Sequence, residues 1–271
     1  MSRLWDLILE PTGLTTVFQP IFEVRGVLRT VFALEALTRG PRATNIERAD
    51  VLFEYVRRKR REREVDRMAI AAALRHARGL PELPGLCFNV HASTLEEDLE
   101  LPDWLAETAA EYGIPLGRVI LEIVEHAPPW SGRQLGENLD RLRELGVRIA
   151  LDDVGLGQSN FRMIVDCRPD LLKIDRSFVT GVYRDDYRRA VLESIAHLAD
   201  RIGSRAVAEG IEDEMDLDAV LNAGIGLLQG FHLCPPHPSP RLRNLQLPFP
   251  VADGWLAPPL AEDRTPTDQI R

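Results

Sequence analysis

Acidic, amide and lysine side chains lie at or near the ends of seven successive apolar runs in this sequence. In chain order they are Glu35, Asn89, Glu122 followed by Glu125, the pair Asp152 and Asp153, Lys173 with Asp175, Glu209 followed by Glu212, and Gln229. One such side chain at a strand end is usually a helix N-cap or a solvated loop residue. Seven in succession predict a shared site, because the ends of barrel strands meet at one rim.

Carboxylates dominate this set, and crowded carboxylates repel one another and are costly to desolvate. Hard cations such as Mg²⁺ or Mn²⁺ offset that cost, whereas structural zinc is not expected without a cluster of Cys or His. The adjacent Asp152 and Asp153 suggest one bridging and one terminal ligand of a two-metal site, which polarises a phosphoryl oxygen and activates water. Lys173 would position that water or stabilise developing charge. The pattern therefore predicts metal-dependent chemistry on a phosphate ester.

Short apolar runs supply the elements that must position these side chains. Eight of them are typical of strands buried on both faces of a parallel sheet. They are Val17–Phe22, Thr30–Ala36, Leu86–Val90, Val119–Val124, Arg148–Asp153, Leu171–Asp175, Arg205–Gly210 and Leu227–Phe231. The first two are joined by a link around Gly26 that is too short for a parallel crossover. We therefore expect an α/β barrel that begins with an antiparallel hairpin.

Segments with helical periodicity separate most of these runs. They are Ile46–Arg78, as two helices or one broken helix, then Pro102–Tyr112, Gly132–Leu145, Tyr187–Ile202 and Asp213–Ala223. Alternating strands and helices predict βα units. We expect one barrel domain over residues 1–245, followed by a proline-rich, loosely packed tail over residues 246–271.

Composition narrows the class of protein further. The 271 residues include 45% hydrophobic residues and carry a formal net charge of -9. That charge argues against a partner such as a nucleic acid polymer. The basic run Arg57–Arg63 is interleaved with acidic residues and is interpreted as a solvated helix face. Neither a secretory signal nor a stretch of about 18 apolar residues is present, so a cytoplasmic protein without a membrane span is expected.

The same motifs resemble those of the EAL family of cyclic-di-GMP phosphodiesterases. The resemblance covers residues 14–240, and eight ordered motifs make it specific. They are Phe18-Gln19-Pro20-Ile21, Glu35-Ala36-Leu37-Thr38-Arg39, Phe88-Asn89-Val90, Leu121-Glu122-Ile123-Val124-Glu125, Asp152-Asp153-Val154-Gly155-Leu156-Gly157, Leu172-Lys173-Ile174-Asp175, Ala208-Glu209-Gly210-Ile211-Glu212 and Gln229-Gly230-Phe231.

The resemblance implies a TIM-like (β/α)8 barrel with an antiparallel first strand, and a bacterial signalling enzyme that hydrolyses cyclic di-GMP to linear pGpG with Mg²⁺ or Mn²⁺. It also implies a homodimer. One metal ion would be held by Glu35, Asn89, Glu122 and Asp152, and a second by Asp152, Asp153 and Glu209. Lys173, Glu209 and Glu35 would be catalytic, with Lys173 on the attacking water and Glu209 as a general base. Gln19, Arg39, Asp175 and Gln229 would bind the dinucleotide, Arg39 through a phosphate, and Glu125 and Glu212 would steady the loops.

The loop after the fifth strand departs from the family pattern, which usually reads DDFGTGYSS. The sequence here keeps both aspartates and both glycines but has Val154, Leu156, Gln158 and Asn160. This departure keeps an alternative open, in which the barrel is a cyclic-di-GMP receptor or protein-interaction module with weak or no turnover. Another open alternative is hydrolysis of a different phosphodiester.

Overall fold

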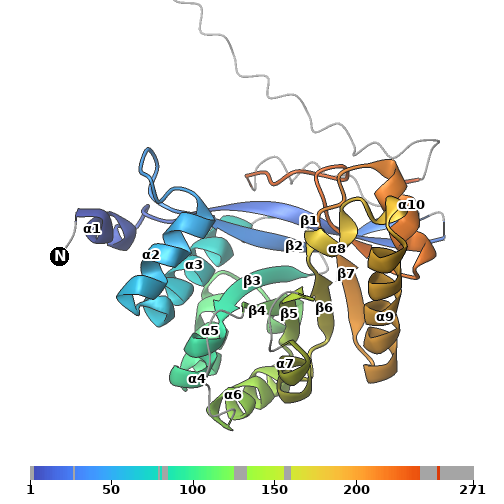
Figure 1. Cartoon of the computed structure of the whole chain (residues 1–271). Helices are drawn as coiled ribbons and strands as arrows, with labels where there is room; N and C mark the ends of the chain where they lie inside the picture. Colours follow the sequence, from blue (N-terminus) through green and yellow to red (C-terminus); the bar gives the residue numbers. More distant parts are fainter. Residues whose placement is uncertain are drawn as a thin grey trace, which may run out of the picture.

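Eight strands close into a barrel in the computed structural model of the chain (Figure 1). The structure describes residues 3–26, 28–78, 80, 85–124, 133–155, 160–238 and 249–250. The barrel strands are β1 Thr15–Arg25, β2 Leu28–Arg39, β3 Leu86–His91, β4 Val119–Val124, β5 Arg148–Val154, β6 Leu171–Ile174, β7 Arg205–Ala208 and β8 Leu227–Leu228. A two-residue strand, β9 Phe249–Pro250, pairs with the start of β2.

The direction of the strands confirms the expected hairpin. β1 is antiparallel to both of its neighbours, β2 and β8, and the other barrel pairings are parallel. The hairpin register runs from Thr15 opposite Arg39 to Arg25 opposite Leu28, so the connection is a tight turn at which Gly26 has a φ of 61°. The fold is therefore the predicted α/β TIM-like barrel with an antiparallel first strand.

Helices surround the barrel, with α2 and α3 beside β2 and β3 and with α9 and α10 beside β7 (Figure 1). Their bounds are α1 Arg3–Leu9, α2 Ala49–Lys59, α3 Glu62–Ala77, α4 Ala92–Glu97, α5 Leu101–Glu111, α6 Arg133–Glu144, α7 Asn160–Cys167, α8 Arg176–Val179, α9 Asp186–Ile202 and α10 Glu214–Asn222, with 3-10 turns at Leu116–Arg118 and Val182–Arg184. Two helices divide the segment expected over Ile46–Arg78, because Arg60 adopts a left-handed backbone at the end of α2. Among the described helices, none has the length and apolar character needed to cross a bilayer.

Several strand ends differ from the expected positions. Strand β7 ends at Ala208 and β8 at Leu228, so Glu209 and Gln229 lie just beyond their strands. Asp175 is also outside its strand, because its side chain caps α8 by accepting from the Ser177 backbone N–H. Glu35, by contrast, lies inside β2, which continues to Arg39. In the segment expected to be a loose tail, Phe249 and Pro250 pair with β2, and residues 251–271 lie outside the described residues.

The inside of the barrel is filled by one apolar layer to which every barrel strand contributes. Its members are Ile21, Phe32, Ala33, Cys87, Ile120, Ala150, Leu171, Val207 and Leu227. Side chains alternate between the two faces of a strand, so the residue two positions further along also points inward. In seven strands that residue is a predicted site residue, as in Ile120 followed by Glu122 and Leu171 followed by Lys173.

Phe32 closes the opposite end of this interior. Its ring lies between two guanidinium groups, 5.2 Å from that of Arg148 at the start of β5 and 5.0 Å from that of Arg205 at the start of β7. Phe32 is 8% exposed, and the two guanidinium groups lie over its ring.

Replacing Phe32 by alanine is expected to lower the free energy of unfolding by about 3–5 kcal/mol, because the change empties the end of the barrel and uncovers two cations. Phe32→Leu keeps most of the apolar volume and should cost less than half as much. Urea denaturation of both variants measures this. Equal losses for the two variants, or no loss for either, would show that the ring does not close the barrel.

Candidate metal and phosphate site

The ammonium group of Lys173 lies among four carboxylates, three of which come from β2, β4 and β5 and the fourth from just beyond β7. Its Nζ is 2.6 Å from Glu209 Oε1, 2.8 Å from Glu122 Oε2, 3.3 Å from Asp152 Oδ1 and 3.4 Å from Glu35 Oε2. The side chains of Lys173 and Glu122 are 1% and 0% exposed. We call these five residues the carboxylate cluster.

The carboxylate cluster carries more negative charge than its lysine can neutralise. Burial lowers the pKa of Lys173, but the surrounding carboxylates outweigh burial and raise that pKa well above its ordinary value. Burial also raises the pKa of Glu122 well above its usual range and, reinforced by the charge of Asp152, raises the pKa of Glu209 to about 8. These shifts show that burial disfavours the charged form of these carboxylates, a cost that a bound divalent cation would offset.

Glu35 is the exception, because amide groups stabilise its charge. Asn89 Nδ2 donates to Glu35 Oε1 at 3.2 Å, and Gln229 Nε2 donates to Glu35 Oε2 at 2.7 Å. Burial opposes ionisation, yet Lys173 and these two amides lower the pKa of Glu35. Gln19 lies opposite Glu35 in the hairpin register and donates to the Cys234 carbonyl at 3.1 Å.

Asp153 joins two members of the cluster where β5 and β7 end. Ligand atoms of Asp152, Asp153 and Glu209 all lie within 4.8 Å of one another. Asp153 has a φ of 52°, which is uncommon for a residue other than glycine. Burial and the neighbouring Asp152 and Asp175 raise the pKa of Asp153 to about 6.

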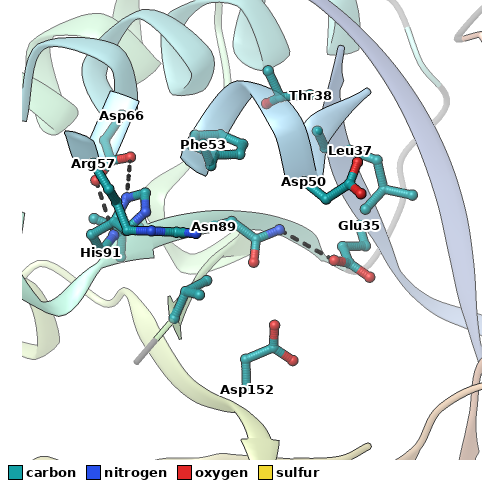
Figure 2. Close-up of a pocket in the computed structure, with 13 residues that line it drawn as sticks. Glu35, Leu37, Thr38, Asp50, Phe53, Arg57, Asp66, Asn89, His91 and Asp152 are labelled. Atoms are coloured by element: carbon teal, nitrogen blue, oxygen red, sulfur yellow. Dashed lines mark hydrogen bonds and ion pairs between the residues drawn. The ribbon is translucent and has the colours of Figure 1, made fainter. Parts of the chain in front are cut away.

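The side chains gathered here suit a divalent cation for two reasons. The atoms they offer as metal ligands are all carboxylate or amide oxygens, as Mg²⁺ and Mn²⁺ prefer. In addition, Glu122 Oε1 is buried and has no hydrogen-bond partner among the described residues. An orphaned buried carboxylate oxygen is expensive unless something positive binds it. Figure 2 shows Asn89 with its amide oxygen turned toward Asp152, on the same side of the cluster.

Close backbone contacts fix the loop that carries Glu209. A Cβ on Gly210 would lie 2.2 Å from the Cβ of Arg176, and a Cβ on Gly230 would lie 2.1 Å from the carbonyl oxygen of Ile211. The loops after β6 and β8 thus press on the loop after β7 from two sides. Only glycine permits this approach, and the Gly-containing motifs at both positions follow from it.

The remaining predicted residues are distributed around this centre. Gln19, Asp175, Glu212 and Gln229 line a cavity of about 260 Å³ together with Lys173 and Glu209. Glu212 is exposed, while Arg39 is half-buried and donates to the Thr38 carbonyl. Glu125 lies outside the described residues, as do residues 156–159 of the altered loop.

Sequence patterns did not indicate a second cavity beside the cluster, between α2 and β3 (Figure 2). Asp50, Phe53 and Arg57 line it from α2. The basic run was interpreted as a solvated face, and Arg58, Lys59 and Arg60 are indeed exposed, but Arg57 faces this cavity. The spacing of positions 50, 53 and 57, which places them on one face of a helix, is the sequence feature that could have indicated this cavity.

A buried carboxylate forms the far wall of that cavity. Asp66 of α3 accepts hydrogen bonds from the backbone N–H of His91 and from Thr94 Oγ1, at 2.9 Å and 2.6 Å, and its other oxygen lies 2.8 Å from His91 Nδ1. This contact fixes the end of β3, two residues beyond Asn89.

Comparisons with known proteins agree with this geometry. The family model described as EAL domain matches residues 6–236, which include all eight barrel strands, so the chain belongs to the EAL domain family. The cyclic di-GMP phosphodiesterase PdeF of Escherichia coli (strain K12) is 34% identical over 137 residues, which are 51% of this chain and 18% of PdeF. The cyclic di-GMP phosphodiesterase RocR of Pseudomonas aeruginosa is 31% identical over 153 residues, which are 56% of this chain and 39% of RocR.

Solved structures show the same barrel. The manganese/cy-diGMP complex of BlrP1 from Klebsiella pneumoniae at pH 9.0 superposes with a TM-score of 0.70 at 25% identity, covering 84% of this chain and 57% of that chain. The chain thus matches well under half the length of PdeF and RocR and somewhat more than half of BlrP1. The acidic centre is accordingly a candidate site for a divalent metal.

Removing the central cation should destabilise the metal-free protein. Lys173→Met is expected to lower the free energy of unfolding by about 3–5 kcal/mol at pH 7.5, because two buried and two partly buried carboxylates lose their counter-charge. Saturating Mn²⁺ should restore part of that loss. Urea denaturation with and without Mn²⁺ measures both effects, and Lys59→Met, at the exposed end of α2, is the matched control.

Glu122→Gln is not expected to lower the free energy of unfolding as Lys173→Met does. It removes one of the mutually repelling charges, so the metal-free protein should be no less stable than the parent while its Mn²⁺ affinity falls at least tenfold. A clear destabilisation by Glu122→Gln, or equal effects of Lys173→Met and Lys59→Met, would contradict this electrostatic account.

Proposed function

We propose that this chain is a metal-dependent phosphodiesterase that hydrolyses cyclic di-GMP to linear pGpG. The observation that carries the proposal is the carboxylate cluster, in which one buried lysine lies among four carboxylates beside a further aspartate. PdeF and RocR are named cyclic di-GMP phosphodiesterases, and their similarity supports the same substrate. We further propose one barrel domain over residues 1–245, with residues 246–271 as a tail, acting in the cytoplasm.

Two divalent ions, Mg²⁺ or Mn²⁺, complete the proposed site. The first would be held by Glu35, Asn89, Glu122 and Asp152, and the second by Asp152, Asp153 and Glu209. When bound, such ions withdraw charge from a phosphoryl oxygen and make water a stronger nucleophile. The excess of buried negative charge and the orphaned Glu122 Oε1 support this assignment.

The chain's own residues orient the reactants and handle the proton. Water attacks phosphorus, and the bond from phosphorus to a ribose 3′ oxygen breaks. The released 3′ oxygen takes a proton from solvent, which leaves a 5′ phosphate and a 3′ hydroxyl. Lys173 contacts the attacking water and stabilises charge on the phosphate. Glu209 accepts the proton from that water, which its position 2.6 Å from Lys173 supports. Glu35, held in place by two amides, completes the catalytic group.

Four residues would hold the dinucleotide: Gln19, Arg39, Asp175 and Gln229. Three of them line the cavity that contains Lys173 and Glu209. Arg39 would bind a phosphate, since a guanidinium offers paired donors to phosphate oxygens. Glu212, at the mouth of the same cavity, and Glu125 would steady the loops around it.

Purified protein with Mg²⁺ or Mn²⁺ is expected to convert cyclic di-GMP to pGpG, and Glu35→Ala should reduce the rate by more than 100-fold because a ligand and the partner of two amides is lost. Chromatography of the products measures turnover. Leu99→Ala, a change at an exposed position of the outer surface, is the control. Tight nucleotide binding without product, with both ions, would contradict the enzymatic proposal.

A cyclic-di-GMP receptor is the second candidate, and the substitutions at Val154, Leu156, Gln158 and Asn160 favour it. They lie directly after the two aspartates proposed for the second ion. Calorimetry separates the two candidates, because a receptor binds cyclic di-GMP saturably and leaves it intact. A panel with pGpG and other cyclic dinucleotides tests the further alternative of another phosphodiester.

We also propose a homodimer through α7 and α9. Phe161 and Val165 on α7 are 77% and 69% exposed, and Tyr187 and Val191 on α9 are 89% and 40% exposed. Each pair is spaced four residues apart on its helix, and Phe161, Tyr187 and Val191 line a groove of about 740 Å³. Exposed apolar surface of this extent next to the β5 loop supports a second copy as its occupant.

Tyr187→Glu is expected to convert the dimer to a monomer, because it places a charge in the centre of an apolar contact. Sedimentation velocity at micromolar concentration measures the oligomeric state. Leu99→Glu introduces the same charge on another exposed position and should leave the dimer intact. A wild-type protein that sediments as a monomer at high concentration would overturn this interface.

A further inference from the structure

Exposed basic side chains gather at the corner between α2 and α3, directly after Arg57, which lines the cavity beside the carboxylate cluster. Residues 54–64 hold six basic and three acidic side chains, although the chain as a whole carries a net charge of -9. We propose that this corner steers the anionic dinucleotide to the carboxylate cluster and so raises its rate of association. The inference rests on the proposed function. Five exposed residues make up what we call the basic corner: Arg58, Lys59, Arg60, Arg61 and Arg63.

The proposed substrate approaches a site of its own charge. Both phosphodiester groups of cyclic di-GMP are negative, and the carboxylate cluster holds four carboxylates around one lysine. Bound divalent ions would cancel much of the charge at the cluster, but Asp50 and Glu212 remain exposed at the two cavities beside it. Opposite charge within about a Debye length, roughly 8 Å at physiological ionic strength, offsets such repulsion most strongly. A basic patch beside the site therefore affects association more than distant charges do.

The position of the basic corner suits this role. Figure 2 shows Arg57 near Asn89, on the same side of the barrel as the carboxylate cluster. The backbone of residues 58–60 continues from there, within about 5 Å of Arg57 along the axis of α2 at the rise of an α-helix. On the other side of the corner, α3 reaches back to the barrel, because its Asp66 accepts from the backbone N–H of His91 at the end of β3. Both arms of the corner thus lead to the end of the barrel that holds the site.

The backbone of Arg60 shows that a cation is kept in this corner at a cost. Arg60 ends α2 with a φ of 54° and a ψ of 51°, and its N–H donates to the Arg57 carbonyl at 2.9 Å. Glycine suits this left-handed position at the end of a helix, whereas a residue with a Cβ is strained there. Arg60 forms no ion pair with any residue that the structure describes. No contact within the described chain therefore offsets the strain.

The start of α3 supplies a second observation of the same kind. Arg61 is the N-cap of α3 and Arg63 lies in its first turn, where the helix macrodipole disfavours cations. Arg61 pairs with Glu64 at 3.1 Å and remains 51% exposed. Arg63 lies 3.2 Å from Asp98, a carboxylate to which Arg67 already donates two hydrogen bonds, and remains 50% exposed. The positive charge of these two arginines is therefore only partly neutralised.

Stabilisation of the helices accounts for only part of the basic corner. Arg58 and Lys59 lie at the end of α2, where the macrodipole favours cations, and Arg58 also pairs with Glu54. That explanation does not extend to the left-handed Arg60 or to the start of α3. A solvated surface requires polar side chains of no particular sign, whereas five of the six residues from 58 to 63 are cations. Steering of an anion accounts for their common sign.

The test separates association from dissociation. Arg58→Gln, Lys59→Gln and Arg60→Gln together remove three charges and leave Arg61 over the Trp5 ring and Arg63 beside Asp98. Surface plasmon resonance, with tethered protein and cyclic di-GMP flowing over it in Mg²⁺, measures both rate constants. At about 20 mM salt the association rate constant should fall about threefold to tenfold, with dissociation changed by less than about twofold, because steering acts before contact. The difference should disappear near 1 M salt, where the Debye length is about 3 Å.

The matched control removes three charges at the opposite end of the barrel. Arg75, Arg78 and Arg201 are exposed at the ends of α3 and α9, next to the segments that lead into the starts of β3 and β7. Their replacement by glutamine changes the net charge equally and should leave association within about twofold of wild type. Equal slowing in both triple variants, slowing that persists at 1 M salt, or faster dissociation with unchanged association would overturn the steering role.

Failure of the steering role and failure of the enzyme give different results. If wild-type protein forms pGpG but the variant of the basic corner associates at the wild-type rate, steering is wrong and the enzymatic proposal stands. If that variant associates slowly while wild-type protein forms no product, steering stands and the chain is a receptor. Absence of any cyclic-di-GMP binding overturns both.

Discussion

The buried ammonium group of Lys173 is the interaction on which the functional end of this barrel depends. Carboxylates from β2, β4, β5 and the end of β7 lie within 3.4 Å of it, and its charge offsets part of the cost of their desolvation. Only two of the 33 basic residues are lysines, and the other one is on an exposed helix end. A compact ammonium can be approached from four directions, whereas the planar guanidinium of arginine favours one or two carboxylates in its own plane. The need for a compact cation among four carboxylates therefore explains why this position is a lysine in a chain whose other basic residues are almost all arginines.

Barrel geometry places those carboxylates with a simple rule. The interior alternates along each strand, so one apolar layer at Cys87, Ile120, Ala150, Leu171, Val207 and Leu227 is followed two residues later by the polar layer. A slip of one residue in any strand would bury a carboxylate among the outer helices and expose an apolar side chain to the site. Stability and function thus constrain the same register. The antiparallel β1 obeys the rule in reverse, with Ile21 following Gln19 along the chain.

This rule is also why the sequence predicts the barrel and the centre of the site well. Strands β3 to β6 lie where their apolar runs predict them to within one residue, because a strand buried on both faces has a strong local signature. The short helices α1, α4, α7 and α8 were not predicted, since four to eight residues give too few turns for periodicity to show. Asp66 and His91 are 25 residues apart, and no spacing links them. The sequence does not single out Arg57, because other charged residues follow it. The direction of its side chain depends on how α2 is rotated against the barrel.

The two residues that complete the acidic centre, Glu209 and Asp153, are held in opposite ways. The loop after β7 is fixed by close backbone contacts at Gly210 and Gly230, so Glu209 has its position whatever binds. Asp153, near the end of β5, instead has a left-handed conformation, which costs a residue with a Cβ about 1 kcal/mol or more. That conformation brings a carboxylate toward Asp152 and Glu209, where electrostatic repulsion opposes it. Strain and repulsion both fall on the residue proposed to bind only the second ion. It follows that Asp153, more than Glu209, is the residue whose conformation a bound cation would stabilise.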